Sequence, residues 1–135
     1  MTTSATDHGQ LTTDQHQRSL ENAVEVARIC DAYRGRDTLV LDLTGITPIC
    51  DYFVITTGTN RRQIHAIADE VNRVLKQSGT RRRGREGYDE SSWVVQDYGD
   101  VVLHVFTPET RTLYDLENLW GDAPHVAWDD SAESE

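Results

Sequence analysis

Residues 91–106, SSWVVQDYGDVVLHVF, constrain the fold of this 135-residue chain more than any other segment. Two strand-length runs flank Tyr98–Asp100, and this pattern predicts a β-hairpin. The return run, 101–106, is apolar on both faces, because side chains alternate across a strand, so it is expected to lie inside a covered sheet. The first run has polar groups on both faces and is expected nearer the edge. Its faces are Trp93, Val95 and Asp97 on one side and Ser92, Val94, Gln96 and Tyr98 on the other.

Helix-like and strand-like segments alternate along the rest of the chain. The clearest helical spacing begins at Asn60, a capping residue with Gln63 in the capping-box position, and ends at Gly79. This order predicts an α/β single domain, with a mixed sheet of about four or five strands covered by helices. The other predicted elements are a helix over 19–35 with Ser19 as N-cap, strands over 38–46 and 48–59, a polar loop over 80–91, and a helix over 108–124 with Leu113, Leu116, Leu119 and Trp120 as its buried stripe.

The two ends of the chain differ in composition from its centre. Residues 1–18 contain almost nothing to bury and are expected to form a disordered lead. Residues 124–135 are expected to form an acidic tail, which leaves a domain over 19–123. No apolar run approaches the ~20 residues that cross a membrane, and no signal peptide is expected. Two cysteines without a Cys-x-x-Cys spacing favour reduced thiols in a cytoplasmic protein.

Charge is distributed unevenly along the chain. The formal net charge is −10, and its field repels phosphate, so a basic protein is a better general partner than free nucleic acid. Eight of the thirteen basic residues nevertheless lie between Arg61 and Arg85. After Gly121 there are five acidic residues and no basic ones.

Three segments together resemble one family. They are CDYFVITTGTNRRQIHAIADEV, SSWVVQDYGDVVLHVF and RTLYDLENLWGDAP, and they resemble the ribosomal silencing factors, or Iojap-like proteins, over about residues 20 to 124. The resemblance implies a nucleotidyltransferase-like topology without an active site and without a cofactor. It also implies binding to large-subunit ribosomal protein fourteen (uL14) on the inter-subunit face. Such binding would hinder joining of the small subunit and repress translation when nutrients are short.

The resemblance also implies a partner-binding surface on the hairpin. A Trp in an arbitrary small domain is more often core than contact, but the family's partner surface includes the positions that match Trp93, Val94 and Asp97. Tyr98 and Asp100 adjoin them and are included in the predicted partner-binding surface, although the alternative is that both residues merely shape the turn. An aromatic anchor with a polar rim is a common source of affinity at protein interfaces.

Several other interpretations remain open at this level. The Arg81–Arg85 run could make a minor contact with rRNA phosphate, but a charge run is more often a solvated loop. A homodimer could use the hairpin edge, and organellar relatives associated with ribosome assembly suggest an assembly factor. A nucleotidyltransferase-like enzyme would need converging carboxylates, whereas Asp69 and Glu70 point ~100° apart on a helix. Asp97 and Asp100 flank a turn and could converge, but no strand supplies an Asp-x-Asp pair. His65 and His104 lack ligand spacing, and His104 is expected to be a satisfied sheet residue, so no metal site is predicted.

Overall fold

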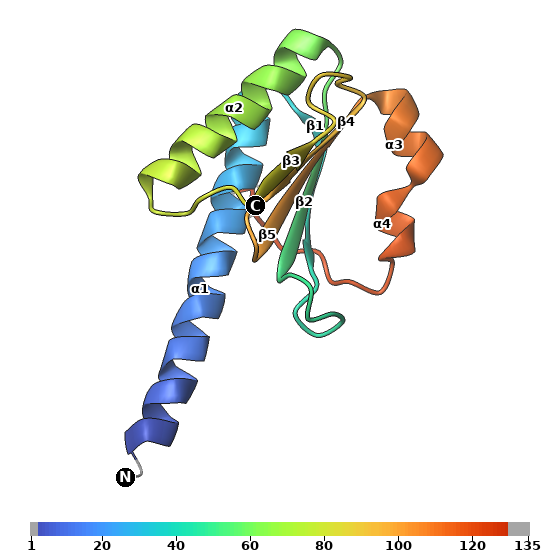
Figure 1. Ribbon diagram of the computed structural model, residues 1–135. Coiled ribbons are helices and arrows are strands. Elements are labelled where there is room, and N and C mark those ends of the chain that lie inside the picture. The colour runs from blue at the N-terminus through green and yellow to red at the C-terminus, as the bar shows by residue number, and fades with distance from the viewer. Residues whose placement is uncertain (1–2, 130–135) are drawn as a thin grey trace.

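A computed structural model describes residues 3–129, with side chains from residue 14 onward. Within these residues a five-stranded sheet has two long helices on one face and two short helices beside the other (Figure 1). The predicted α/β domain with a mixed sheet is confirmed. The helices are α1 (Thr3–Ala32), α2 (Arg61–Gln77), α3 (Pro108–Tyr114) and α4 (Leu116–Leu119). The strands are β1 (Arg36–Asp42), β2 (Tyr52–Thr57), β3 (Gly84–Glu86), β4 (Trp93–Asp97) and β5 (Val101–Phe106).

The strands lie in the order β1-β2-β5-β4-β3, with β2 and β5 parallel and the other pairs antiparallel. A parallel pair needs a crossover, and α2 is part of the connection from β2 to β5. β5 is central, as the sequence predicts. β4 lies one strand in from the edge, because β3 pairs with it. The expectation of a polar loop over 80–91 is therefore wrong for residues 84–86, which form β3. β3 has only three residues, all exposed, and such a short segment shows no strand pattern in the sequence.

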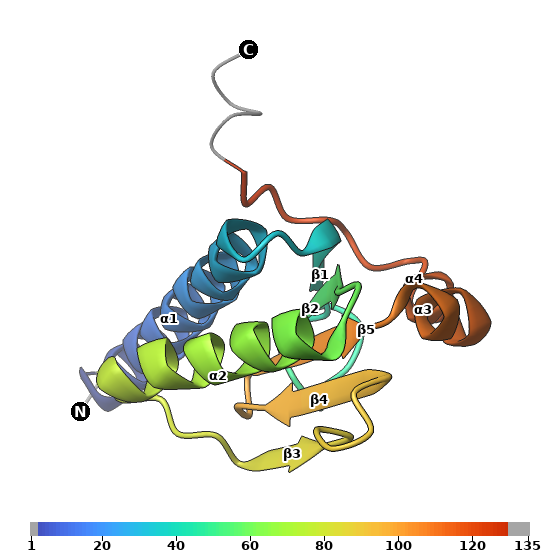
Figure 2. The same ribbon diagram turned by 90° about the horizontal axis from the view of Figure 1, so that it is seen from above.

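The main core fills the space between the sheet and the helices α1 and α2, which lie on the same side of the sheet (Figure 2). Helical spacing on both helices places small and branched apolar side chains toward the strands. The Asn60 cap is confirmed, because its side chain accepts a hydrogen bond from the Gln63 amide at 2.8 Å. The fully buried helix residues are Ala23, Val26, Ala27, Cys30, Ile64, Ile67, Ala68 and Val71.

Helix α1 is longer than the sequence predicts. It begins at Thr3, so residues 3–18 are helical rather than a disordered lead; residues 1–2 lie outside the described part. Ser19 is not an N-cap but a buried residue within the helix, with its hydroxyl 3.0 Å from both the Gln15 carbonyl and Asp100 Oδ2. A hydroxyl can bond to the carbonyl four residues earlier, which lets Ser lie inside a helix. Residues 3–18 have no apolar stripe, so the helical pattern in the sequence did not reveal this first part of α1.

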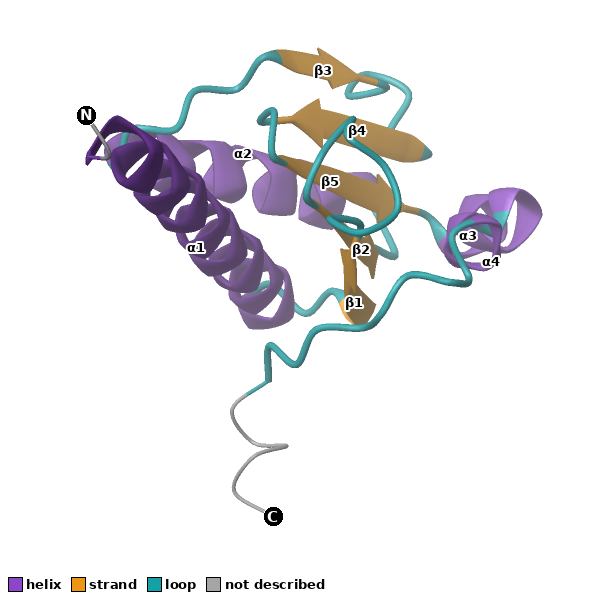
Figure 3. Ribbon diagram, turned by 90° about the horizontal axis from the view of Figure 1, so that it is seen from below, coloured by secondary structure: helices purple, strands orange, loops and turns teal. Residues whose placement is uncertain are grey.

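The start of the expected acidic tail is part of the folded domain. Residues 124–129, here called the C-terminal strap, run along the free edge of β1 (Figure 3). The Asp42 amide donates to the Pro124 carbonyl, and the Val126 amide donates to the Val40 carbonyl, both at 2.8 Å. Trp128 packs against the main core. The domain therefore extends beyond residue 123, and only residues 130–135 of the expected tail lie outside the described part.

The predicted last helix is broken in two. Pro108 starts α3 as expected, but Asp115 adopts a left-handed conformation with φ 49° and separates α3 from α4. The break changes the helical phase, so the predicted buried stripe is wrong for two leucines. Leu113 and Leu119 are 76% and 75% exposed, and only Leu116 is buried. No helix within residues 3–129 is long and apolar enough to span a bilayer.

Candidate partner-binding face

The sheet face away from α1 and α2 is only partly covered. Strand register places Trp93 opposite Phe106, Val95 opposite His104 and Asp97 opposite Val102. On the other side of β5, Phe53 of β2 lies opposite Val102. The surface is called here the Trp93 face. Its half-buried members are Phe53, Trp93, Val95, Asp97 and Val102, with Trp120 from the segment after α4.

Trp93 is held in one orientation by three neighbours. Its indole Nε1 donates a hydrogen bond to His104 Nδ1 at 3.1 Å. Its ring stacks on Phe106, with 4.9 Å between centroids, and lies 4.7 Å from the Tyr114 ring. A large aromatic side chain that is partly exposed and already ordered loses little conformational freedom when a partner covers it. These properties are the ones expected of an interface anchor.

His104 lies beneath Trp93 and is buried on the same face. Burial lowers the pKa of its imidazole from 6.5 to about 4, so the ring is neutral at pH 7. A neutral ring can accept the Trp93 hydrogen bond at Nδ1 and then carries its proton on Nε2. Nε2 has no hydrogen-bond partner within the described part of the chain, so His104 is only half satisfied, contrary to expectation. The Phe53 ring packs edge-on against it at 4.5 Å.

An apolar ridge borders the Trp93 face. It consists of the exposed side chains of α3 and α4, Leu113, Tyr114 and Leu119, and Tyr114 contacts Trp93 directly. Several large exposed apolar side chains near an ordered aromatic are typical of sites of protein interaction. The helical spacing in the sequence had predicted that both leucines of the ridge, Leu113 and Leu119, would be buried.

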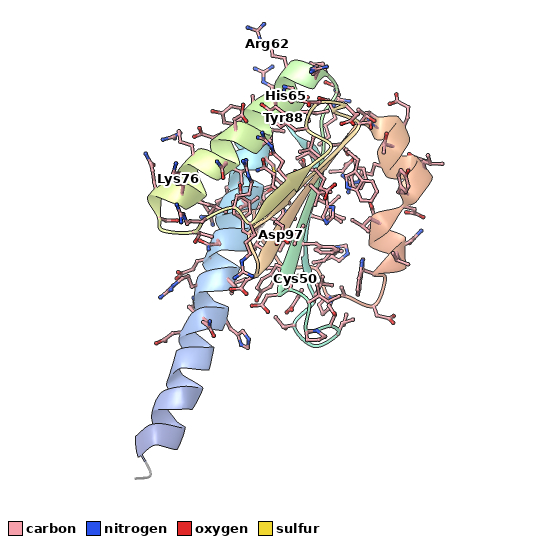
Figure 4. The ribbon with its side chains drawn as sticks, viewed as in Figure 1. Cys50, Arg62, His65, Lys76, Tyr88 and Asp97 are labelled. Carbon is pink, nitrogen blue, oxygen red and sulfur yellow. The ribbon has the colours of Figure 1, made fainter. Side chains whose placement is uncertain are left out.

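Carboxylates gather at the opposite end of the face. Burial, and to a smaller extent the negative charges of Asp51, Asp97 and Asp100, raises the pKa of the Cys50 thiol to about 11. Figure 4 shows Asp97 and Cys50 toward the same end of the sheet. We call these three aspartates the acidic end. Asp97 also accepts a hydrogen bond from the Gly99 amide at 2.7 Å, which orders its carboxylate within the turn.

The hairpin residues predicted to bind a partner do not all lie on one surface. Trp93 and Asp97 lie on the Trp93 face. Val94 has no exposed surface and Tyr98 is buried, because alternation along β4 directs both into the main core. Their side chains cannot meet a partner there, which corrects the prediction. Asp100 is exposed at the turn, and its Oδ2 accepts from Ser19.

Asp69 and Glu70, two of the candidate catalytic carboxylates, are each engaged by another side chain. Asp69 accepts a hydrogen bond from the Tyr88 hydroxyl at 2.9 Å, and Glu70 pairs with Arg73 at 2.7 Å. Among residues 14–129 no group of three or more His, Cys, Asp or Glu side chains could hold a metal ion. His65 stacks on Tyr88 with ring centroids 3.9 Å apart, and Nε2 of His65 lies 2.7 Å from the Tyr88 carbonyl. Figure 4 shows the two residues next to each other. These contacts attach the loop before β4 to α2.

Comparison with known protein families shows to which family the chain belongs. The profile of the family "Ribosomal silencing factor during starvation" matches residues 16–135. The chain belongs to the ribosomal silencing factor family. The ribosomal silencing factor RsfS of Bacillus subtilis is 46% identical over 98 residues, which cover 73% of this chain and 83% of that protein. A crystal structure of a Chromobacterium violaceum protein superposes with a TM-score of 0.70 at 36% identity, covering 78% of this chain and 85% of that one.

The name of a more distant relative refers to mitochondria. The mouse protein "Mitochondrial assembly of ribosomal large subunit protein 1" is 36% identical over 89 residues, which cover 64% of this chain and 39% of that protein. The family profile of the silencing factors also includes the C-terminal strap, in agreement with its packing on β1. The region of resemblance is thus wider than the 20–124 expected from the motifs.

Proposed function

We propose that this silencing factor binds the large ribosomal subunit at ribosomal protein uL14 through the Trp93 face. Bound there, it opposes joining of the small subunit and represses translation when nutrients are limiting. The observation that carries the proposal is the ordered, partly exposed Trp93, whose indole is fixed by His104 and whose ring contacts Tyr114 of the apolar ridge. Family membership directs the proposal to the ribosome.

The chemistry of the surface suits a basic ribosomal protein. An apolar centre provides most of the affinity at protein interfaces, and charged groups at the rim mainly guide approach and register. The Trp93 face has such a centre, and the acidic end supplies carboxylates at one side. The net charge of −10 favours the encounter with a basic surface.

An assembly factor is the second candidate function. The name of the mouse relative supports it, because that name places the protein in assembly of the large subunit. Both functions require binding to large-subunit components, and they differ in whether mature subunits are the target. A homodimer through the same face would compete with either function, since Trp93 cannot be covered twice.

Co-sedimentation with purified large subunits tests the proposal. Trp93→Ala should weaken binding at least about thirtyfold, corresponding to ~2 kcal/mol for an anchor residue. Trp128→Ala is the matched control, because Trp128 is also half-buried and also donates an indole hydrogen bond, to the Thr38 carbonyl at 3.1 Å. It lies on the C-terminal strap and should leave binding unchanged. Equal binding by the Trp93 variant and the control would refute the assignment of the face.

A further inference from the structure

A second surface lies where α1 meets the turn between β4 and β5. It is a hollow of about 340 Å³ whose walls come from α1, the segment after α2, and the hairpin turn. We call it the arginine hollow. The side chains that define its charge are Arg18, Arg81, Arg83 and Asp100.

Its three arginines are not neutralised by the protein. Arg18 lies on α1, and Arg81 and Arg83 lie on the segment between α2 and β3. None of the three makes an ion pair within residues 14–129, whereas Arg73, Arg85 and Arg111 each pair with a carboxylate. Arg18, Arg81 and Arg83 are all solvent-exposed, so their unpaired guanidinium groups form a local positive surface, open to an anionic partner, in a protein of net charge −10.

The fold makes room for one of these guanidinium groups. A Cβ atom on Gly99 would lie 2.8 Å from Arg83 Cζ, so any side chain at this turn would displace the arginine. Gly99 also has a φ of 89°, which favours glycine independently. The Arg83 amide donates to the Asp97 carbonyl at 2.7 Å, and this hydrogen bond holds the arginine backbone against the turn.

The rest of the lining is mostly neutral. The Asn22 amide donates to the Thr80 hydroxyl at 3.2 Å, which ties α1 to the segment after α2. Asp100 is the only acidic residue of the lining, and one of its carboxylate oxygens already accepts from Ser19. Three positive charges therefore face one negative charge that is partly engaged.

The positive surface continues beyond the hollow. Arg81 is shared with an adjoining smaller hollow, which Lys76 and Arg82 also line. The two adjoining hollows form a strip of five cations, Arg18, Lys76, Arg81, Arg82 and Arg83. Such a strip suits a chain of regularly spaced phosphates better than a single small anion.

We propose that the arginine hollow and this strip bind backbone phosphates of RNA. Guanidinium groups are well matched to phosphate oxygens because they can donate two parallel hydrogen bonds. Asp100 belongs both to the hollow and to the acidic end, so the two surfaces meet at the β4–β5 turn. The inference rests on the proposed function, since a ribosomal subunit presents protein and RNA side by side.

The first test uses the isolated full-length protein and a 12-nucleotide single-stranded RNA at low salt. Amide NMR signals of residues 79–83 should shift on titration in the unmodified protein. The shifts should be lost in the double variant Arg81→Gln/Arg83→Gln and retained in Arg34→Gln/Arg36→Gln, a control with the same change in net charge. Unaffected signals at 79–83, or equal responses of the two variants, would overturn the proposal. Stronger shifts with inorganic phosphate than with RNA would make the hollow a small-anion site instead.

The second test separates this inference from the proposed function. In binding to large subunits, Arg81→Gln/Arg83→Gln should reduce the slope of log Kd against log salt by about 1.4 to 1.8 relative to the control, at ~0.7–0.9 per phosphate contact. Trp93→Ala should weaken binding without changing that slope. If the protein responds to RNA but does not bind subunits, the proposed function fails and the hollow stands. If it binds subunits but the arginine variant keeps the control's slope, the hollow is not an RNA site on the ribosome.

Discussion

Two aromatic residues determine the character of the Trp93 face. His104 accepts the indole hydrogen bond only while it is neutral, and its burial beside Phe53 and Trp93 keeps it so. The family's motifs predicted Trp93 and Asp97 as partner-binding residues, and both lie on this face. The sequence could not show that His104 would hold the indole, because that contact depends on the register between β4 and β5.

The buried imidazole predicts a dependence of stability on pH. Below pH 6.5 the unfolded chain takes up a proton on His104, whereas the folded protein does not until about pH 4. The free energy of unfolding should therefore fall as pH is lowered through this window. His104 should account for a loss of about 2 kcal/mol between pH 7 and pH 5.

Urea unfolding of the wild-type protein and His104→Gln at both pH values measures this contribution. The variant should lose about 2 kcal/mol less between the two conditions, whatever its stability at pH 7. An identical loss in both proteins would show that His104 does not titrate as its burial requires.

Neighbouring residues of the hairpin should separate stability from binding. Leu103 is fully buried in the main core, so Leu103→Ala should lower the free energy of unfolding by ~2–5 kcal/mol. Trp93→Ala should have a smaller effect, because the indole is only half buried. Thermal melting and subunit binding measured on both variants test this division. A Trp93 variant that unfolds as readily as the Leu103 variant would place Trp93 in the core.

At the level of elements, strong periodic patterns were predicted correctly and short or irregular segments were not. The stripe and cap of α2, and the apolar return strand β5, leave few alternatives. By contrast, β3 has three exposed residues and forms only because β4 offers a free edge. The break at Asp115 depends on a left-handed backbone conformation that no periodicity shows. It is this break that separates α3 from α4, and Leu113 and Leu119 on these helices are exposed.

The C-terminal strap should contribute to stability although its composition resembles a tail. Truncation after Ala123 removes the acceptor for the Asp42 amide and the packing of Trp128. The truncated protein should lose at least about 1.5 kcal/mol of stability, the effect of exposing one large apolar side chain. The Asp42 amide should also exchange faster with solvent hydrogen.

Truncation after Asp129 provides the control, because it removes residues 130–135 and keeps the strap. Melting and hydrogen exchange should be unchanged in this shorter deletion. Equal melting temperatures for the two truncated proteins would mean that the strap adds nothing.

For the whole molecule, the distribution of charge affects how a partner is approached. A net charge of −10 attracts a basic ribosomal protein at long range, and salt screens that attraction over a Debye length of ~10 Å at ~0.1 M. Raising the salt concentration should slow association with the large subunit more than it speeds dissociation. Stopped-flow measurement of both rates tests this expectation. An association rate that does not change with salt would remove electrostatic steering from the mechanism.

Subunit joining is the process that the Trp93 face is proposed to block. Light scattering during mixing of purified small and large subunits measures joining directly, with the protein at saturating concentration. The wild-type protein and Trp128→Ala should both reduce the joined fraction, and Trp93→Ala at the same concentration should leave it near the level without protein. Unchanged joining in the presence of the wild-type protein, or equal inhibition by the Trp93 variant, would contradict the proposal.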